Sequence, residues 1–219
     1  MYAIIVGGGR VGAVIASALI EKGNEVLVIE RSAPRSDGLR ERLGSCVTCG
    51  DGCETAVLAE AGTDRADVFI AVTEGDEDNL VACQVAKHRF HVSRIVARVN
   101  NPRNVNIFKV LGIDATVNAV ETLADGVLYE VPGVNRTHMA AFQKSGLRLI
   151  GVKLPDHAAS IGKPIVEVPL PKGVSIAVIV RNDGTTQLPS DEVILEPEDE
   201  VIAVALPELE EALVQALTR

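Results

Sequence analysis

Residues 4–12, IIVGGGRVG, constrain the fold more than any other part of the chain. A run of apolar, β-favouring residues ends at three glycines, and an apolar stretch with helical periodicity follows. A strand that passes through glycines into a helix is the context of a dinucleotide-binding turn. In such a turn the first glycine permits a tight bend, the second lets phosphates approach the main chain, and the third lets helix and strand pack closely.

The turn consists of six consecutive residues: Gly7, Gly8, Gly9, Arg10, Val11 and Gly12. The N–H groups at the start of the predicted helix, together with its positive end, would attract phosphates. Arg10 is the less usual member, and its guanidinium offers a forked donor to a pyrophosphate or polyphosphate. A solvated side chain at the start of the helix is the alternative interpretation of Arg10.

An acidic residue follows where a dinucleotide-binding turn requires one. Glu30 ends the second predicted strand, eighteen residues after Gly12, and its carboxylate can accept hydrogen bonds from ribose hydroxyls. Arg31 comes directly after it and would contact a phosphate or pair with Glu30. Strand, turn, helix and acid together predict an adenine-nucleotide site, whereas a glycine turn required only for packing is the alternative.

Two further strand ends face the same crevice, because doubly wound sheets bind ligands at the carboxyl ends of their strands. Gly50 and Asp51 follow the third predicted strand, and Asp51 is expected near adenine. Thr73 and Glu74 follow the fourth strand and are expected to contact the rest of the nucleotide.

Charged residues near these strand ends need an explanation. Asp76 or Asp78 would take part in the site or, equally well, cap the helix that starts there. Arg98 is an isolated charge late in the apolar fifth strand. Since charges are rarely buried without a partner, we expect a carboxylate or a ligand phosphate to contact it.

Strands and helices alternate over the first 117 residues, which indicates right-handed crossovers and one mainly parallel sheet covered on both faces. The predicted strands are 2–6, 25–30, 45–49, 67–73, 94–99 and 114–118. The predicted helices are 11–22, 37–43, 54–61, 76–90 and 104–112. This pattern predicts an α/β class, Rossmann-like doubly wound domain over residues 1–118.

The pattern changes after residue 118. A predicted helix over 119–130 leads into a linker, because Pro132 and Gly133 break both periodicities. We expect a crossover helix and linker over 119–136 and a small α+β domain over 137–219. The strand-like segments of that domain are 138–143, 147–154, 174–181, 185–188, 192–195 and 200–206, and an amphipathic helix closes the chain at 207–219.

The overall composition excludes several classes of protein. A formal net charge of −9 argues against a general nucleic-acid-binding protein, because a surface that follows phosphates needs an excess of Lys and Arg. No stretch approaches the ~20 apolar residues of a membrane span. Met1 and Tyr2 lead directly into a strand and leave no room for a signal peptide, so a cytoplasmic location is expected.

Four cysteines, Cys46, Cys49, Cys53 and Cys83, are expected to be reduced thiols that pack in the core. The run CVTCGDGC leaves a metal or redox role as the alternative. On a strand over 45–49, however, Cys46 and Cys49 would point to opposite faces, and no histidine lies nearby. We therefore assign no metal ligands.

Several segments together resemble the RCK (KTN) family, the cytosolic regulators of potassium channels and of Trk/Ktr-type potassium transporters. In the first half these are GGGRVG, the strand-ending Glu30, GDG at 50–52, AVTEGDEDNLVACQVAK, and RVNNPRN at 98–104. In the second half, IGKPIVEVPLPKGVSIAVIVRNDG and LPSDEVILEPEDEVIAV resemble the family's small C-terminal domain. The resemblance covers essentially the whole chain.

The resemblance implies a regulatory subunit and not an enzyme. NAD(H) or ATP/ADP would bind in the crevice, with Arg10 at the terminal phosphate or pyrophosphate, Glu30 at the ribose and Asp51 near adenine. Homodimers formed through the crossover helix would assemble into a ring that docks on a membrane-embedded potassium transporter subunit, at the inner face of the cell membrane. The nucleotide pocket would be completed by Thr73, Glu74 and Arg98.

Two other functions are compatible with the sequence. An NAD-dependent oxidoreductase would need a substrate domain with an acid/base group, and only about 80 residues in short β segments follow the linker. The second is a nucleotide sensor of another cation transporter, and no motif distinguishes it from a regulator of potassium transport. The apolar faces of 104–112 and 119–130 are candidates for self-association, and an ordinary core would explain them equally well.

Overall fold

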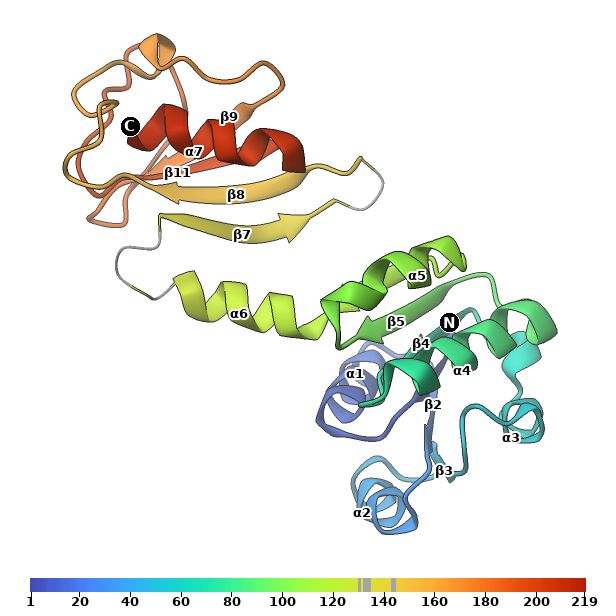
Figure 1. The fold of residues 1–219 in the computed structure, drawn as a ribbon. Helices are drawn as coiled ribbons and strands as arrows, with labels where there is room; N and C mark the ends of the chain where they lie inside the picture. Colours follow the sequence, from blue (N-terminus) through green and yellow to red (C-terminus); the bar gives the residue numbers. More distant parts are fainter. Residues whose placement is uncertain (130, 132–134, 143–144) are drawn as a thin grey trace. The chain divides into compact units, whose positions relative to one another are not determined.

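The computed structural model describes residues 1–129, 131, 135–142 and 145–219. The chain divides into two compact units, Met1–Thr122 and Leu123–Arg219 (Figure 1). The predicted linker turn at 132–133 lies outside the described residues. No helix in the described part of the chain is long and apolar enough to cross a membrane.

The first unit is a doubly wound sheet, as the sequence predicts. Its six strands are all parallel and lie in the order β3-β2-β1-β4-β5-β6. The strands are β1 (Tyr2–Val6), β2 (Glu25–Glu30), β3 (Val47–Cys49), β4 (Val68–Ala71), β5 (Ile95–Val99) and β6 (Ala115–Asn118). The helices are α1 (Arg10–Glu21), α2 (Ala33–Leu43), α3 (Thr55–Glu60), α4 (Asp76–Phe90) and α5 (Val105–Val110), and α6 (Ala119–Tyr129) crosses the boundary between the units.

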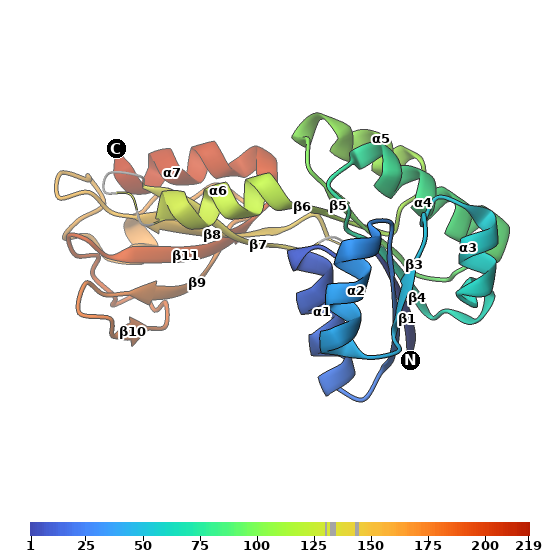
Figure 2. The same ribbon diagram turned by 90° about the horizontal axis from the view of Figure 1, so that it is seen from below.

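Strand β1 lies at the centre of this sheet and divides its core into two layers. Because successive side chains of a strand point to opposite faces, Ile4 packs in one apolar cluster and Ile5 in the other. Figures 1 and 2 show α1 and α2 on one face of the sheet and α3, α4 and α5 on the other. Burial on both faces explains why these strands read as continuous apolar runs.

Helix α2 and strand β3 differ from the prediction at their first residues. Helix α2 begins at Ala33, earlier than the predicted residue 37, with a proline in its first turn. Pro34 has no N–H to leave unsatisfied and its φ is already helical, so the polar segment that follows joins the helix. Strand β3 begins at Val47 and excludes Cys46, whose thiol donates to the carbonyl of Leu43 instead.

The cysteines do not all pack in the core. Only Cys83 is fully buried, and burial raises the pKa of its thiol to about 12. Burial, together with Asp51 and Asp78, raises the pKa of the half-buried Cys53 thiol to about 11. Cys49 is exposed, so the prediction of core packing is wrong for it. Among the described residues no group of His, Cys, Asp and Glu side chains gathers that could hold a metal ion.

The second unit is a five-stranded antiparallel sheet in the order β10-β9-β11-β8-β7, with one helix packed on it (Figure 1). Its core is formed by strand residues such as Ile150 and Ala203 and by Leu213 and Leu217 of the helix. The predicted strand 192–195 is instead a single bridge between Pro164 and Ile194. The elements are β7 (Arg136–Ala141), β8 (Arg148–Lys153), β9 (Ser175–Val180), β10 (Thr186–Gln187), β11 (Glu200–Ala205) and α7 (Glu210–Thr218).

A buried carboxylate ties helix α7 to this sheet. Glu210 is 5% exposed, and its Oε1 accepts a hydrogen bond from Arg148 at 2.9 Å. Its Oε2 lies 2.8 Å from Nε2 of His138 on β7. His138 thus helps to hold α7 on the sheet.

Substitution of Gly12 tests the packing of the turn. A Cβ at Gly12 would lie 1.9 Å from the Gly7 carbonyl oxygen, whereas a Cβ at Gly9 would meet nothing within 4 Å. We expect Gly12→Ala to lower the free energy of unfolding by ~2–4 kcal/mol, because backbone must move to admit the methyl group. Gly9→Ala should change it by less than about 1 kcal/mol. Equal denaturant midpoints for the two variants would contradict this packing.

Candidate nucleotide-binding site

The candidate site lies where the strand order reverses, between β1 and β4. In doubly wound sheets this switch point opens a crevice at the carboxyl ends of the strands. Gly7 directly follows β1 and has a φ of +106°, a conformation that side-chain-bearing residues rarely adopt. A Cβ there would also lie 3.0 Å from the backbone nitrogen of Thr73. The turn after β1 and the loop after β4 are therefore in direct contact.

The start of α1 presents unused backbone donors. The first intrahelical bond runs from the Ala13 N–H to the Gly9 carbonyl, so the N–H groups of Arg10, Val11 and Gly12 have no acceptor within the helix. No atom within 4 Å would meet a side chain at Gly9, which leaves the main chain approachable. An anion placed there would also be stabilised by the positive end of the helix.

Arg10 is exposed and forms no ion pair or hydrogen bond within the described part of the chain. Val11 beside it is 43% exposed. Neither side chain is therefore committed to the fold, and the guanidinium of Arg10 is free to turn towards a ligand.

Glu30 is 3% exposed, and its carboxylate is already occupied by the protein. Its Oε2 accepts from the N–H of Gly8 at 2.9 Å, and its Oε1 accepts from the N–H of Ser32 at 2.7 Å. Arg35 donates to Oε1 through Nε at 3.2 Å and through its terminal nitrogen at 3.0 Å. Burial raises the pKa of Glu30, but the bonds from Ser32, Arg35 and Gly8 outweigh it, and the pKa lies below its usual range.

The pairing of Glu30 corrects one alternative considered for Arg31. Arg35, not Arg31, is the partner of Glu30. Arg31 lies 3.6 Å from Oδ2 of Asp51 and 3.9 Å from Oδ2 of Asp78. Sequence reasoning missed Arg35, because the predicted helix over 37–43 leaves this residue outside the first turn that brings it to Glu30.

Asp51 and Gly50 form a compact turn after β3. Asp51 Oδ1 accepts from the N–H of Cys53 at 2.9 Å, and the N–H of Gly50 donates to the Glu30 carbonyl at 3.0 Å. A Cβ at Gly50 would lie 2.8 Å from a methyl group of Val57. The turn is thus held beside the end of β2, with Asp51 half-exposed at its edge.

A fully buried asparagine fixes the loop after β4. The Oδ1 of Asn79 accepts from the N–H and the hydroxyl of Thr73, both at 2.8 Å. Its Nδ2 donates to the carbonyls of Thr73 and Arg98 at 3.2 and 3.0 Å. Asn79 therefore joins the ends of β4 and β5. This residue was not predicted, because its bond to the Arg98 carbonyl on β5 forms only once the sheet has assembled.

Asp76 performs a related task and is not a helix cap. Helix α4 has Gly75 at its N-cap position with no side-chain cap. The Asp76 carboxylate accepts instead from the N–H groups of Asn100 and Asn101 at 2.7 and 3.0 Å, and from Nδ2 of Asn104 at 2.8 Å. Burial raises the pKa of Asp76, but these bonds outweigh it and lower the pKa below its usual value.

Arg98 lies at the end of β5 with an unsatisfied donor. Its Nε is buried and has no hydrogen-bond partner, and no carboxylate within the described residues forms an ion pair with it. The expected carboxylate partner is therefore not found. A buried unpaired guanidinium N–H is costly, so of the two partners expected for Arg98 the ligand phosphate remains a prediction. Glu74, in contrast, is exposed, and its backbone carbonyl accepts a hydrogen bond from Nδ2 of Asn100 at 3.1 Å.

These features fit an adenine nucleotide. The free N–H groups at the start of α1 and the unpaired Arg98 suit phosphates, and the open main chain at Gly9 allows their approach. At the ribose, fewer acceptor positions remain for a ligand, because the Glu30 carboxylate already accepts from four N–H groups, among them that of Gly8.

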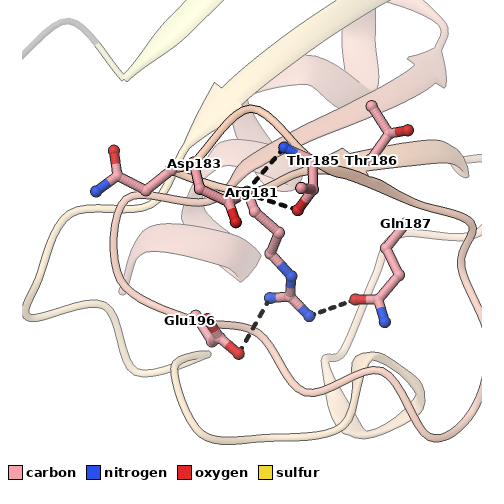
Figure 3. Close-up of a pocket in the computed structure, with 7 residues that line it drawn as sticks. Arg181, Asp183, Thr185, Thr186, Gln187 and Glu196 are labelled. Atoms are coloured by element: carbon pink, nitrogen blue, oxygen red, sulfur yellow. Dashed lines mark hydrogen bonds and ion pairs between the residues drawn. The ribbon is translucent and has the colours of Figure 1, made fainter.

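A separate hollow of about 560 Å³ lies in the second unit, around the hairpin between β9 and β10. Figure 3 shows Arg181 at its centre, directed towards Gln187 and Glu196. Arg181 also donates to the buried Asp199 at 2.5 Å. Its charge is thus compensated within the fold, so the hollow offers an anion no free cation comparable to Arg98.

The Asp76 carboxylate, which accepts hydrogen bonds from Asn100, Asn101 and Asn104, gives the stability of the first unit a measurable pH dependence. A carboxyl group whose pKa is lower in the folded state stabilises the fold above its unfolded pKa of about 3.9, and this stabilisation is lost as the pH falls towards the folded pKa. We expect Asp76→Asn to be ~1–3 kcal/mol less stable at pH 7, with the difference narrowing below about pH 4. Glu77→Gln, an exposed carboxylate on the same turn, is the control. Denaturant unfolding that shows a pH-independent difference would contradict this role.

Comparisons with known proteins bear on both units. Residues 3–119 match the TrkA-N domain and residues 149–217 the TrkA-C domain. The chain is 32% identical over 218 residues to the Trk system potassium uptake protein TrkA of Mycobacterium tuberculosis, covering 99% of this chain and 98% of the relative. It is 30% identical over 196 residues to a TrkA homolog of Methanothermobacter thermautotrophicus, covering 90% of this chain and 89% of the relative.

Solved structures give the same assignment. The GsuK RCK domain is 26% identical, with a TM-score of 0.53, and the match covers 98% of this chain and 46% of that chain. The GsuK channel bound to NAD matches with a TM-score of 0.52 at 26% identity, covering 98% of this chain and 38% of that chain. This chain spans less than half of either one. The resemblance to RCK proteins is confirmed, and the chain belongs to the TrkA family, with a TrkA-N domain around the glycine turn and a TrkA-C domain over most of the antiparallel sheet.

Proposed function

We propose that this chain is the nucleotide-binding regulatory subunit of a potassium uptake system. NAD(H) or ATP/ADP binds in the crevice between β1 and β4 and biases the activity of a membrane-embedded transporter subunit. The observation that carries the proposal is that the α1 N–H groups without an acceptor in the helix and an Arg98 Nε without a partner in the described residues lie at the same edge of the sheet. The names of the relatives, potassium uptake proteins, support the system in which it acts.

In this proposal each strand-end residue has a separate task. The N–H groups of the turn and Arg98 hold phosphates, and Arg10 reaches the terminal phosphate or the pyrophosphate. Asp51 lies near adenine, and Thr73 and Glu74 line the remainder of the nucleotide. Glu30 contacts the ribose through Oε2, which accepts a single hydrogen bond from the described residues, that of Gly8.

The bound nucleotide acts as a signal and undergoes no chemistry. A ligand shifts a conformational equilibrium only by the difference in its affinity for the two states. ATP and ADP share the adenosine contacts and differ at the terminal phosphate, so discrimination between them must come from groups at that end. Arg10 is suited to this because its side chain is exposed and uncommitted.

Self-association and docking complete the proposal. Helix α6 leaves Leu123 72% exposed and Val127 66% exposed, and α5 leaves Val110 83% exposed. Apolar side chains on neighbouring turns of a helix favour a homodimer contact. We infer that dimers formed in this way assemble into a ring at the inner face of the cell membrane. Co-purification with a potassium transporter, and not with a different cation transporter, would distinguish the proposed partner.

Substitution of Arg10 tests whether this side chain discriminates between ATP and ADP. We expect Arg10→Ala to weaken ATP by about tenfold, the loss of one charge-assisted contact, while ADP weakens by less than about threefold. Isothermal titration of both nucleotides measures the ratio, and Arg42→Ala, an exposed arginine on α2, is the control for net charge. Equal losses of affinity for ATP and ADP would show that Arg10 does not discriminate between them. No heat from ATP, ADP or NADH with the unmodified protein would contradict the proposed function itself.

A further inference from the structure

The ribose end of the site holds a carboxylate that is nearly saturated. A carboxylate offers about four lone-pair positions, and Glu30 already receives four hydrogen bonds. Three of them reach Oε1, from Ser32 and Arg35, and one reaches Oε2, from Gly8. Glu30 therefore cannot accept bonds from both hydroxyls of a ribose unless a protein donor leaves.

Arg35, the partner of this carboxylate, has N–H donors that no group in the described residues uses. A guanidinium carries five N–H donors, and Arg35 gives two of them to Glu30, through Nε and one terminal nitrogen. No other acceptor for Arg35 exists within the described residues, and its side chain is 64% exposed. The edge that contains both terminal nitrogens is thus left for a ligand, and that edge matches the geometry of a phosphate.

The neighbouring arginine is committed elsewhere. Arg31 lies between Asp51 and Asp78, whose two negative charges exceed its single positive charge. At Glu30 the balance differs, because Arg35 neutralises the carboxylate in an ion pair of 3.0 Å. A second anion brought to this point would meet an available guanidinium edge and a carboxylate whose charge is already compensated.

We propose that Arg35 enables the site to accept an adenine nucleotide that carries a 2′-phosphate, so that NADP(H) binds as well as NAD(H). In dinucleotide-binding folds the acid after the second strand contacts the ribose 2′-hydroxyl, and a nearby arginine accommodates a 2′-phosphate. This chain has both groups in one ion pair. The inference rests on the proposed nucleotide-binding function and makes Arg35 its specificity-determining residue.

NADH and NADPH provide the test because they differ only in the 2′-phosphate. Titrations followed by calorimetry or by nucleotide fluorescence should give the unmodified protein dissociation constants for the two within about tenfold. Arg35→Ala should weaken NADPH by at least about tenfold more than NADH, through loss of charge-assisted hydrogen bonds. Arg35→Lys keeps the charge without the fork and should recover part of this loss.

A matched control separates this effect from net charge. Arg42 lies two turns further along α2, is exposed, and forms no ion pair within the described residues. Arg42→Ala should leave the NADPH-to-NADH ratio unchanged. Binding of NADH but not NADPH by the unmodified protein, or equal weakening of both by Arg35→Ala, would overturn this inference and leave the proposed function intact. Failure of NADH, ATP and NADPH alike would overturn both.

Discussion

The contact between the turn after β1 and the first turn of α1 is the constraint on which the site depends. With the Gly7 carbonyl oxygen 1.9 Å from where a Gly12 Cβ would lie, strand and helix approach as closely as a backbone allows. That approach brings the start of α1, where the N–H groups of Arg10, Val11 and Gly12 have no acceptor within the helix, against the turn after β1. The loop after β4 contacts the same turn at Gly7. Geometry that serves packing therefore also forms the anion-binding surface.

The described site separates charges that are compensated from charges that are not. Glu30 and Asp76 are buried, receive several hydrogen bonds each, and have lowered pKa values. They position loops and are ionised before any ligand arrives. Arg10 and the Nε of Arg98 have no partner in the described residues. Positive groups without a partner near the carboxyl ends of the strands favour a polyanion, and differences between polyanions can then be expressed as differences in conformational equilibrium.

Most of the fold followed from the sequence, because periodicity and punctuation agree there. Apolar runs such as 2–6 and 25–30 end at glycines or charges, and β1 and β2 have those bounds. The bounds of α2 and β3 were wrong because a proline-initiated, polar helix has little apolar periodicity. In the second half, residues 192–195 have strand composition, but they form a single bridge, through Ile194 to Pro164, whose missing N–H cannot extend a ladder.

Less of the site could be predicted, because several of its contacts join residues that are far apart along the chain. Glycines and the terminal acid of β2 are local signals, so the turn and Glu30 were identified directly. Asn79 was missed and the role of Asp76 was left open, because partners such as Arg98 and Asn104 lie 19 and 28 residues away and come close only in the assembled sheet. Arg35 was missed because its pairing depends on where α2 begins. The roles in nucleotide binding assigned from sequence stay predictions.

The central claim is that the α1 N–H groups receive the phosphates of an adenine nucleotide. Titration of ¹⁵N-labelled protein with ADP, followed by NMR, tests it most directly. The account predicts saturable shifts at the amides of Arg10, Val11 and Gly12, with a smaller change at Gly8, whose N–H already donates to Glu30. Saturable binding that leaves the Arg10, Val11 and Gly12 amides unchanged would contradict the account.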